Sequence, residues 1–173
     1  AYLLRSGDRR RDGRSALYPA IRAWLGPSLR VRILPAEPGA SAAAANADAI
    51  ALFTGQAAVS SIGAIRLRPG AVADHLTSFG GVLIAPAGDT RTGGNGQMRA
   101  LRWLEAGASG SYGTVVEPCN LLSKFPHPGL LLSYYRRGDS LLESYWRSVA
   151  MPEQGVFIGD PLTRPWPARP GRS

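Results

Sequence analysis

The stretch "AIALFTG" at residues 49–55 decides the fold class, because it is an unbroken apolar run that ends at a glycine. A short run of this kind between turn residues is typical of a β-strand that is buried on both faces of a sheet. The stretches "GVLIA" at 81–85 and "SGSYGTVV" at 109–116 have the same character. We therefore expect three buried core strands in this part of the chain.

Segments with helical spacing, or with helix start and stop signals, separate the expected strands. "SALYPAIRAWLG" at 15–26 places Leu17, Ile21 and Leu25 on one helical face. "PGAVADHLTSFGG" at 69–81 begins with proline and ends with two glycines, which predicts a short helix. The remaining expected elements are helices at 97–107, 128–138 and 140–149 and strands at 29–35 and 155–159. This alternation predicts an α/β fold, a three-layer sandwich with a mostly parallel sheet.

The length of 173 residues suits one domain with a substantial core. We expect a basic, flexible segment at 1–14, a single α/β domain at 15–166 and a flexible tail at 167–173. Much of the net charge of +8 lies in residues 1–35, with eight arginines against two aspartates. No nucleic-acid motif or aromatic interleaving accompanies these arginines, so no nucleic-acid partner is expected. No apolar run approaches the roughly 20 residues of a membrane span, so no membrane insertion of this portion is expected.

A single cysteine, Cys119, excludes an internal disulfide framework and a zinc site built from several cysteines. A metal site would have to use His75, Asp74, Glu117 and Cys119, with His127 as a further donor. No pair of histidines at helical spacing supports such a site. We therefore expect neither a metal nor a cofactor.

Polar residues gather near the expected ends of strands and helices. In parallel sheets, ligands bind outside the carboxyl ends of the strands, here the loops expected at 54–57, 85–95 and 117–124. The polar residues concerned are Asp74, His75, Thr77, Ser78, Gln97, Glu117, Asn120 and Lys124, the last being the only lysine of the chain. If they converge, they form a polar pocket, for which we expect a protein or peptide ligand.

Cys119 and His75 form the candidate catalytic pair. A cysteine thiol attacks well only as a thiolate, which needs a nearby base or positive field. His75 could supply the base, with Asp74 or Glu117 orienting it. The stretch "EPCN" at 117–120, however, lacks the tight, amide-rich turn that usually surrounds a cysteine nucleophile. A structural role, with His75 capping a backbone group and Cys119 packed in a loop, therefore remains open.

Several motifs together cover roughly residues 49–166, namely "ADHLTSFGG", "GASGSYGTVVEPCN", "KFPHP", "SYWRSV" and "FIGDPL". In these motifs the chain resembles an uncharacterised family of bacterial hypothetical proteins. That family is in turn distantly similar to gingipain-type cysteine peptidases, which have the caspase-like α/β fold. The resemblance implies a caspase-like fold for this chain, as the C-terminal part of a longer protein.

The resemblance also implies where a peptidase dyad would lie. In gingipain-type peptidases the catalytic histidine lies in a Gly-His-Gly turn after one core strand, and the cysteine ends the next strand. The corresponding stretches here are 54–57, which has no histidine, and 84–87, which has no cysteine. We therefore expect a non-catalytic binding or structural module on a caspase-like fold. The alternative is a cysteine-dependent hydrolase, a peptidase or amidase, that uses a relocated Cys119–His75 pair.

Overall fold

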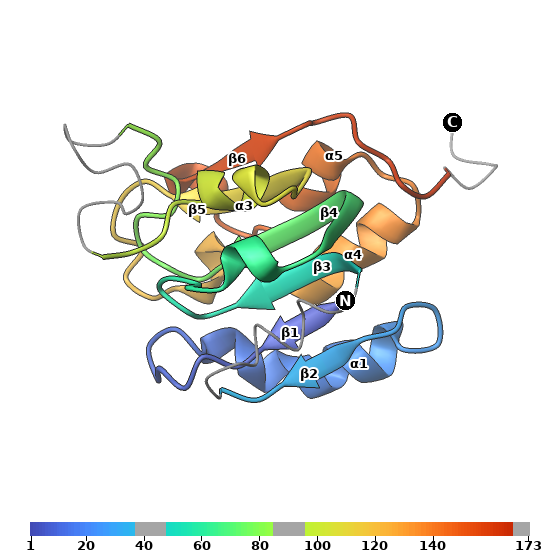
Figure 1. The fold of residues 1–173 in the computed structure, drawn as a ribbon, viewed down its shortest axis with the longest axis horizontal. Coiled ribbons are helices and arrows are strands. Elements are labelled where there is room, and N and C mark those ends of the chain that lie inside the picture. The colour runs from blue at the N-terminus through green and yellow to red at the C-terminus, as the bar shows by residue number, and fades with distance from the viewer. Residues whose placement is uncertain (37–47, 85–95, 168–173) are drawn as a thin grey trace.

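The computed structural model describes residues 1–36, 48–84 and 96–167. Six strands form one sheet in the order β2-β1-β3-β4-β5-β6 (Figure 1). They are β1 Tyr2–Leu4, β2 Arg32–Leu34, β3 Ala49–Thr54, β4 Leu67–His75, β5 Gly110–Thr114 and β6 Gly155–Gly159. β1 to β5 are parallel, and β6 is antiparallel to β5 at the edge. The mostly parallel α/β architecture expected from the sequence is confirmed. The loop expected at 85–95 and all but the first residue of the expected tail lie outside the described residues.

The helices begin at local signals in the sequence. The α-helices are α1 Tyr18–Leu25, α3 Leu101–Glu105, α4 Pro128–Arg136 and α5 Leu141–Trp146. The 3-10 helices are η1 Gly13–Leu17, η2 Ile62–Ala64, η3 Leu122–Lys124 and η4 Pro152–Gln154. At the start of α5, Ser140 and Glu143 form a reciprocal capping box, and at the start of α4 the His127 side chain accepts the N–H of Leu130. The α-helices fall within four of the predicted helical segments, with shorter bounds. None of the helices in the described ranges is long and apolar enough to cross a bilayer.

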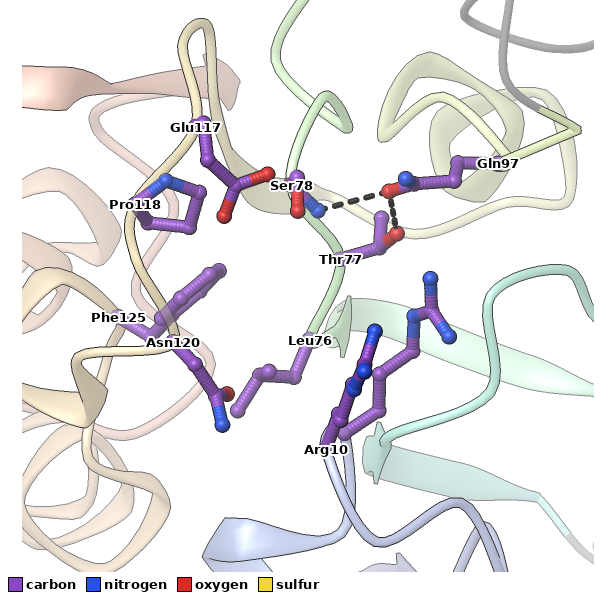
Figure 2. A pocket seen from close by; sticks show the side chains of 10 residues that line it. Arg10, Leu76, Thr77, Ser78, Gln97, Glu117, Pro118, Asn120 and Phe125 are labelled. Carbon is purple, nitrogen blue, oxygen red and sulfur yellow. Dashed lines mark hydrogen bonds between the residues drawn. The ribbon is translucent and has the colours of Figure 1, made fainter.

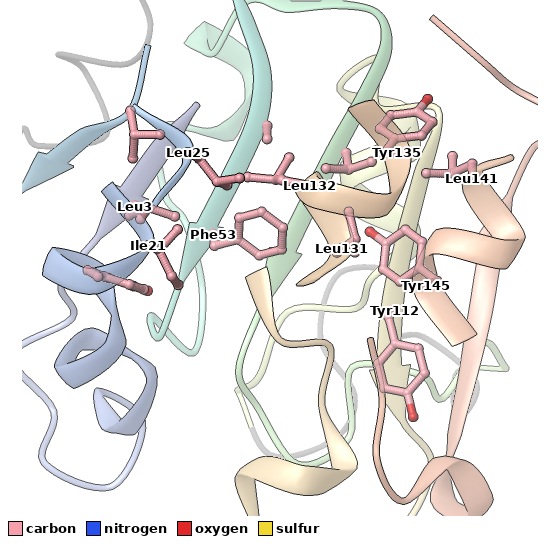
Figure 3. Packing of buried hydrophobic residues seen from close by; sticks show 14 of the residues in the cluster. Leu3, Ile21, Leu25, Phe53, Tyr112, Leu131, Leu132, Tyr135, Leu141 and Tyr145 are labelled. Atoms are coloured by element: carbon pink, nitrogen blue, oxygen red, sulfur yellow. The ribbon is translucent and has the colours of Figure 1, made fainter. Parts of the chain in front are cut away.

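One face of the sheet is covered by α1, α4 and α5. Phe53 of β3 is fully buried there, with Ile21 of α1 on one side and Leu131 of α4 on the other (Figure 3). Tyr112 of β5 and Tyr145 of α5 stack with ring centroids 6.4 Å apart. These large side chains form the main core of the protein.

The opposite face of the sheet is covered by α3, η2 and the segment before α3. Trp103 of α3 is fully buried and belongs to a second apolar cluster with Leu4 of β1, Ala73 of β4 and Met98. Since successive residues of a strand point to opposite faces, neighbouring residues of β4 enter different cores. The sheet is therefore the middle of three layers.

The helix predicted at 69–81 is wrong, because most of this stretch belongs to strand β4. Pro69 and Gly70 lie where the pairing of β3 with β4 shifts register, and Gly70 has a φ of +82°. Proline and glycine are tolerated at such irregularities of a strand. The pairing of β4 with β3 and β5 has therefore overridden the local helix signals.

The strand predicted at 81–85 is also wrong over its described residues, 81–84. Leu83 and Ile84 are 46% and 86% exposed, whereas a core strand would bury them. The chain instead turns tightly after β4, and the Gly81 N–H donates to Thr114 O at 2.9 Å. A Cβ on Gly81 would lie 2.2 Å from Gly113 O, so this close approach requires glycine.

The basic segment at 1–14 was expected to be flexible, but it enters the core. β1 lies between β2 and β3, and its Leu3 and Leu4 are fully buried. Arg14 is also buried, with 2% of the residue exposed. The turn that follows β1 brings its arginines to the carboxyl edge of the sheet.

Candidate functional site

A pocket of about 310 Å³ lies at the carboxyl edge of the sheet (Figure 2). Its walls come from the segments after β1, β4 and β5, from the residue before Met98 and from the residue after η3. The lining residues are Arg10, Arg11, Leu76, Thr77, Ser78, Gln97, Glu117, Pro118, Asn120 and Phe125. Five of the polar residues singled out in the sequence, Thr77, Ser78, Gln97, Glu117 and Asn120, therefore share one concave surface.

Gln97 ties one wall of the pocket to the segment that follows β4. Its Oε1 accepts from the hydroxyl of Thr77 and from the N–H of Ser78, the latter at 2.7 Å. The hydroxyl of Thr114, at the end of β5, donates to Ser78 O at 2.5 Å. Neighbouring strand ends are thus joined by side-chain hydrogen bonds, which fix the shape of the pocket.

Glu117 lies on the turn that follows β5. Its Oε1 accepts the N–H of Cys119 at 3.1 Å, while Cys119 and Asn120 both have positive φ angles, 53° and 55°. Asparagine tolerates this left-handed conformation better than most residues. The turn places Glu117 and Asn120 in the pocket wall, and the exposed Cys119 is not among the lining residues.

The arginine wall comes from the turn between β1 and η1. Arg11 forms an ion pair with Asp8 at 2.5 Å, and the N–H of Arg10 donates to the same carboxylate at 2.9 Å. Hydrogen bonding to Arg10 and Arg11 lowers the pKa of Asp8. A Cβ on Gly55 would lie 2.1 Å from Arg11 O, so the glycine after β3 lets this turn pass closely over the sheet edge.

Asp74, near the end of β4, forms a buried ion pair with Arg14. The Arg14 Nη2 to Asp74 Oδ1 distance is 3.0 Å, and both side chains are at most 3% exposed. Arg14 also donates to Thr54 O and Pro126 O at 3.2 Å each. Burial raises the pKa of Asp74 to about 6, and the charge of Arg14 opposes that rise. This arginine therefore holds the ends of β3 and β4 together.

His75 is buried on the opposite face of the sheet from Asp74. Its Nδ1 accepts from Trp103 Nε1 at 3.0 Å, so Nε2 carries the proton and donates to Met98 O at 2.6 Å. Burial lowers the pKa of His75 to about 4, so the ring is neutral near neutral pH. Both ring nitrogens are used in the core, which leaves neither for a thiol.

The structure therefore separates the residues considered for catalysis. Cys119 is exposed on a surface turn, Asp74 and His75 are buried on opposite faces of β4, and Glu117 lines the pocket. The geometry gives no support to a Cys119–His75 pair oriented by Asp74 or Glu117. Lys124, placed with the polar group in the sequence, is buried at 8% exposure and does not line the pocket.

Three residues of the site and its support are not among the sequence candidates. Arg10 and Arg11 lie in the segment that the sequence predicts to be flexible, and Trp103 lies in the helix predicted at 97–107. No local signal identifies the arginines, because their position depends on β1 pairing between β2 and β3. Within the described ranges, no three His, Cys, Asp or Glu side chains lie close enough to hold a metal ion.

Comparison of the chain with protein-family models, with curated proteins and with solved structures gives no match.

Proposed function

We propose that this chain is a non-catalytic binding module on a caspase-like fold, and that its ligand is a peptide. The observation that carries the proposal is the convergence of five predicted polar residues on one pocket at the carboxyl edge of the sheet. Ligands of parallel α/β sheets bind at this edge, and a concave site with a few polar groups is the usual form of a binding site.

The absence of the usual dyad supports a binding role over hydrolysis. The resemblance to gingipain-type peptidases puts the nucleophile at the end of the strand that follows the histidine turn. That turn follows β3 and contains Gln56. The stretch at 84–87, where the sequence predicts the end of the next strand, has no cysteine, and neither has β4, the strand that follows β3 in the structure. Neither position has the residue type of the dyad, and His75 is committed to Met98 and Trp103.

A peptide is the ligand class that the lining groups favour. The side-chain amide of Asn120 and the hydroxyl of Ser78 can each donate to and accept from a peptide bond. Leu76 and Phe125 add apolar surface for a side chain. The hydrolase alternative has no comparable observation in its favour.

The proposal is tested with ¹⁵N-labelled chain and synthetic peptides of two to six residues, free and blocked at their ends. We expect amide shifts that concentrate at Thr77, Ser78 and Asn120 and no peptide cleavage by mass spectrometry. Cys119→Ser should bind as the unaltered chain does. Cleavage that disappears in Cys119→Ser would establish the hydrolase instead, and an absence of shifts with every peptide would reject the binding module.

A further inference from the structure

The pocket carries opposite charges on two of its walls. Arg10 comes from the turn after β1, and Glu117 from the turn after β5 (Figure 2). Among the described residues, neither side chain has an ion-pair partner, whereas the neighbouring Arg11 is paired with Asp8. The guanidinium of Arg10 and the carboxylate of Glu117, which also accepts the Cys119 N–H, therefore border the same pocket without an ion pair between them.

We infer that the pocket takes a short peptide with both termini free, its carboxylate toward Arg10 and its ammonium group toward Glu117. This inference rests on the proposed peptide-binding function and narrows it to one class of ligand. Each terminus would form a charge-assisted hydrogen bond, which is stronger than one between neutral groups. A ligand with a single charge would remove water from both Arg10 and Glu117 but form an ion pair with only one of them, which is unfavourable.

The size of the pocket favours a short peptide. At about 310 Å³, the pocket lies at the small end of the range of about 300–1,000 Å³ that is usual for ligand sites. A dipeptide of small residues is therefore the probe that we choose. Its central amide would lie near Ser78 and Asn120, which are neutral polar residues of the same pocket.

The experiment uses L-alanyl-L-alanine and three blocked forms, N-acetylated, C-amidated and blocked at both ends. Affinity is measured from amide shifts of the ¹⁵N-labelled chain at low salt, where surface charges are least screened. We expect each single block to weaken binding about tenfold, because each removes one hydrogen bond between charged groups. Free L-alanine, which separates an amino acid site from a dipeptide site, should bind more weakly than the dipeptide.

Charge-neutral variants assign each terminus to its wall. Arg10→Gln should lose the preference for the free peptide over its C-terminal amide and keep the preference for a free amino end. Glu117→Gln should show the reverse. The matched controls are Arg9→Gln and Glu153→Gln, which change exposed residues outside the pocket and should keep both preferences. All four positions are on the surface or at its edge, so the fold should be retained in each variant.

The possible failures are distinguishable. If the doubly blocked peptide binds as tightly as the free one, the site recognises an internal peptide segment; the inference fails and the proposed function stands. Tighter binding of L-alanine than of the dipeptide would also overturn the inference. Preferences that survive in both Arg10→Gln and Glu117→Gln would show that other groups recognise the termini. If no peptide of any form causes shifts, the inference and the proposed function fail together.

Discussion

Replacing His75 with glutamine tests whether the buried imidazole is a neutral structural element. Glutamine can accept from Trp103 Nε1 and donate to Met98 O as the ring does, but it does not titrate. The folded chain holds the pKa of His75 at about 4, against 6.5 for an ordinary histidine. As the pH falls, His75 is therefore protonated in the unfolded chain before it is protonated in the folded chain. This difference favours unfolding.

The sign and size of the effect follow from these two pKa values. The stability that neutral His75 contributes is complete above pH 6.5 and is lost as the pH falls toward 4. The loss between about pH 7 and about pH 4.5 amounts to about 2.5 kcal/mol, since each tenfold change is worth about 1.4 kcal/mol. Asp74 acts in the opposite direction, because its raised pKa makes the folded state bind a proton more readily between pH 6 and 3.8. The pH dependence of the unaltered chain is therefore flatter than His75 alone would make it.

Urea unfolding of both proteins at the two pH values isolates His75, because Asp74 is common to them. We expect the difference in unfolding free energy between the unaltered chain and His75→Gln to shift by about 2.5 kcal/mol in favour of the variant on acidification. Heteronuclear NMR of the ring nitrogens should show the Nε2–H tautomer at neutral pH. A difference that stays constant with pH would refute the assignment of His75 as a buried, neutral ring.

Two further predictions concern the framework of the pocket. Arg14→Gln leaves the buried carboxylate of Asp74 without its partner, so we expect the free energy of unfolding in urea to fall by about 3–5 kcal/mol. The control is Arg66→Gln, whose ion pair with Asp48 is exposed and whose loss should cost at most about 1 kcal/mol. Equal losses in the two variants would contradict the core role of Arg14. Gly81→Ala places a methyl group against Gly113 O and should cost about 1–3 kcal/mol, whereas Gly63→Ala, with open space around it, should be close to neutral; a neutral Gly81→Ala would show that the β4 turn does not need this close approach.

The parts of the fold that the sequence predicts are those governed by local pattern. The spacing of Ile21 and Leu25 marks α1, and the unbroken run at 49–55 marks β3. Proline and glycine signals fail at 69–81 because β4 is decided by pairing with β3 on one side and β5 on the other. Since the β4 assignment was wrong, the turn after it was also placed too late along the chain.

The same distinction between local pattern and long-range pairing applies to the residues of the candidate site. The sequence predicts Thr77, Ser78 and Asn120 as site residues because polar residues next to apolar runs mark the ends of elements. This signal is the same whether the element is a helix or a strand. Arg10 and Arg11 were not, because a strand of only three residues, Tyr2–Leu4, carries no periodic signal. Their approach to Glu117 depends on contacts between segments more than 100 residues apart.

The claim that a peptide binds in the pocket at the carboxyl edge of the sheet is tested most directly by locating the bound peptide on the protein. Isotope-filtered NOE spectra with L-alanyl-L-alanine should show contacts from the peptide methyl groups to Leu76 and to the ring of Phe125, which are apolar side chains of the pocket drawn in Figure 2. Contacts confined to another surface, such as the apolar depression lined by Leu130 and Leu122, would place binding elsewhere and contradict the account.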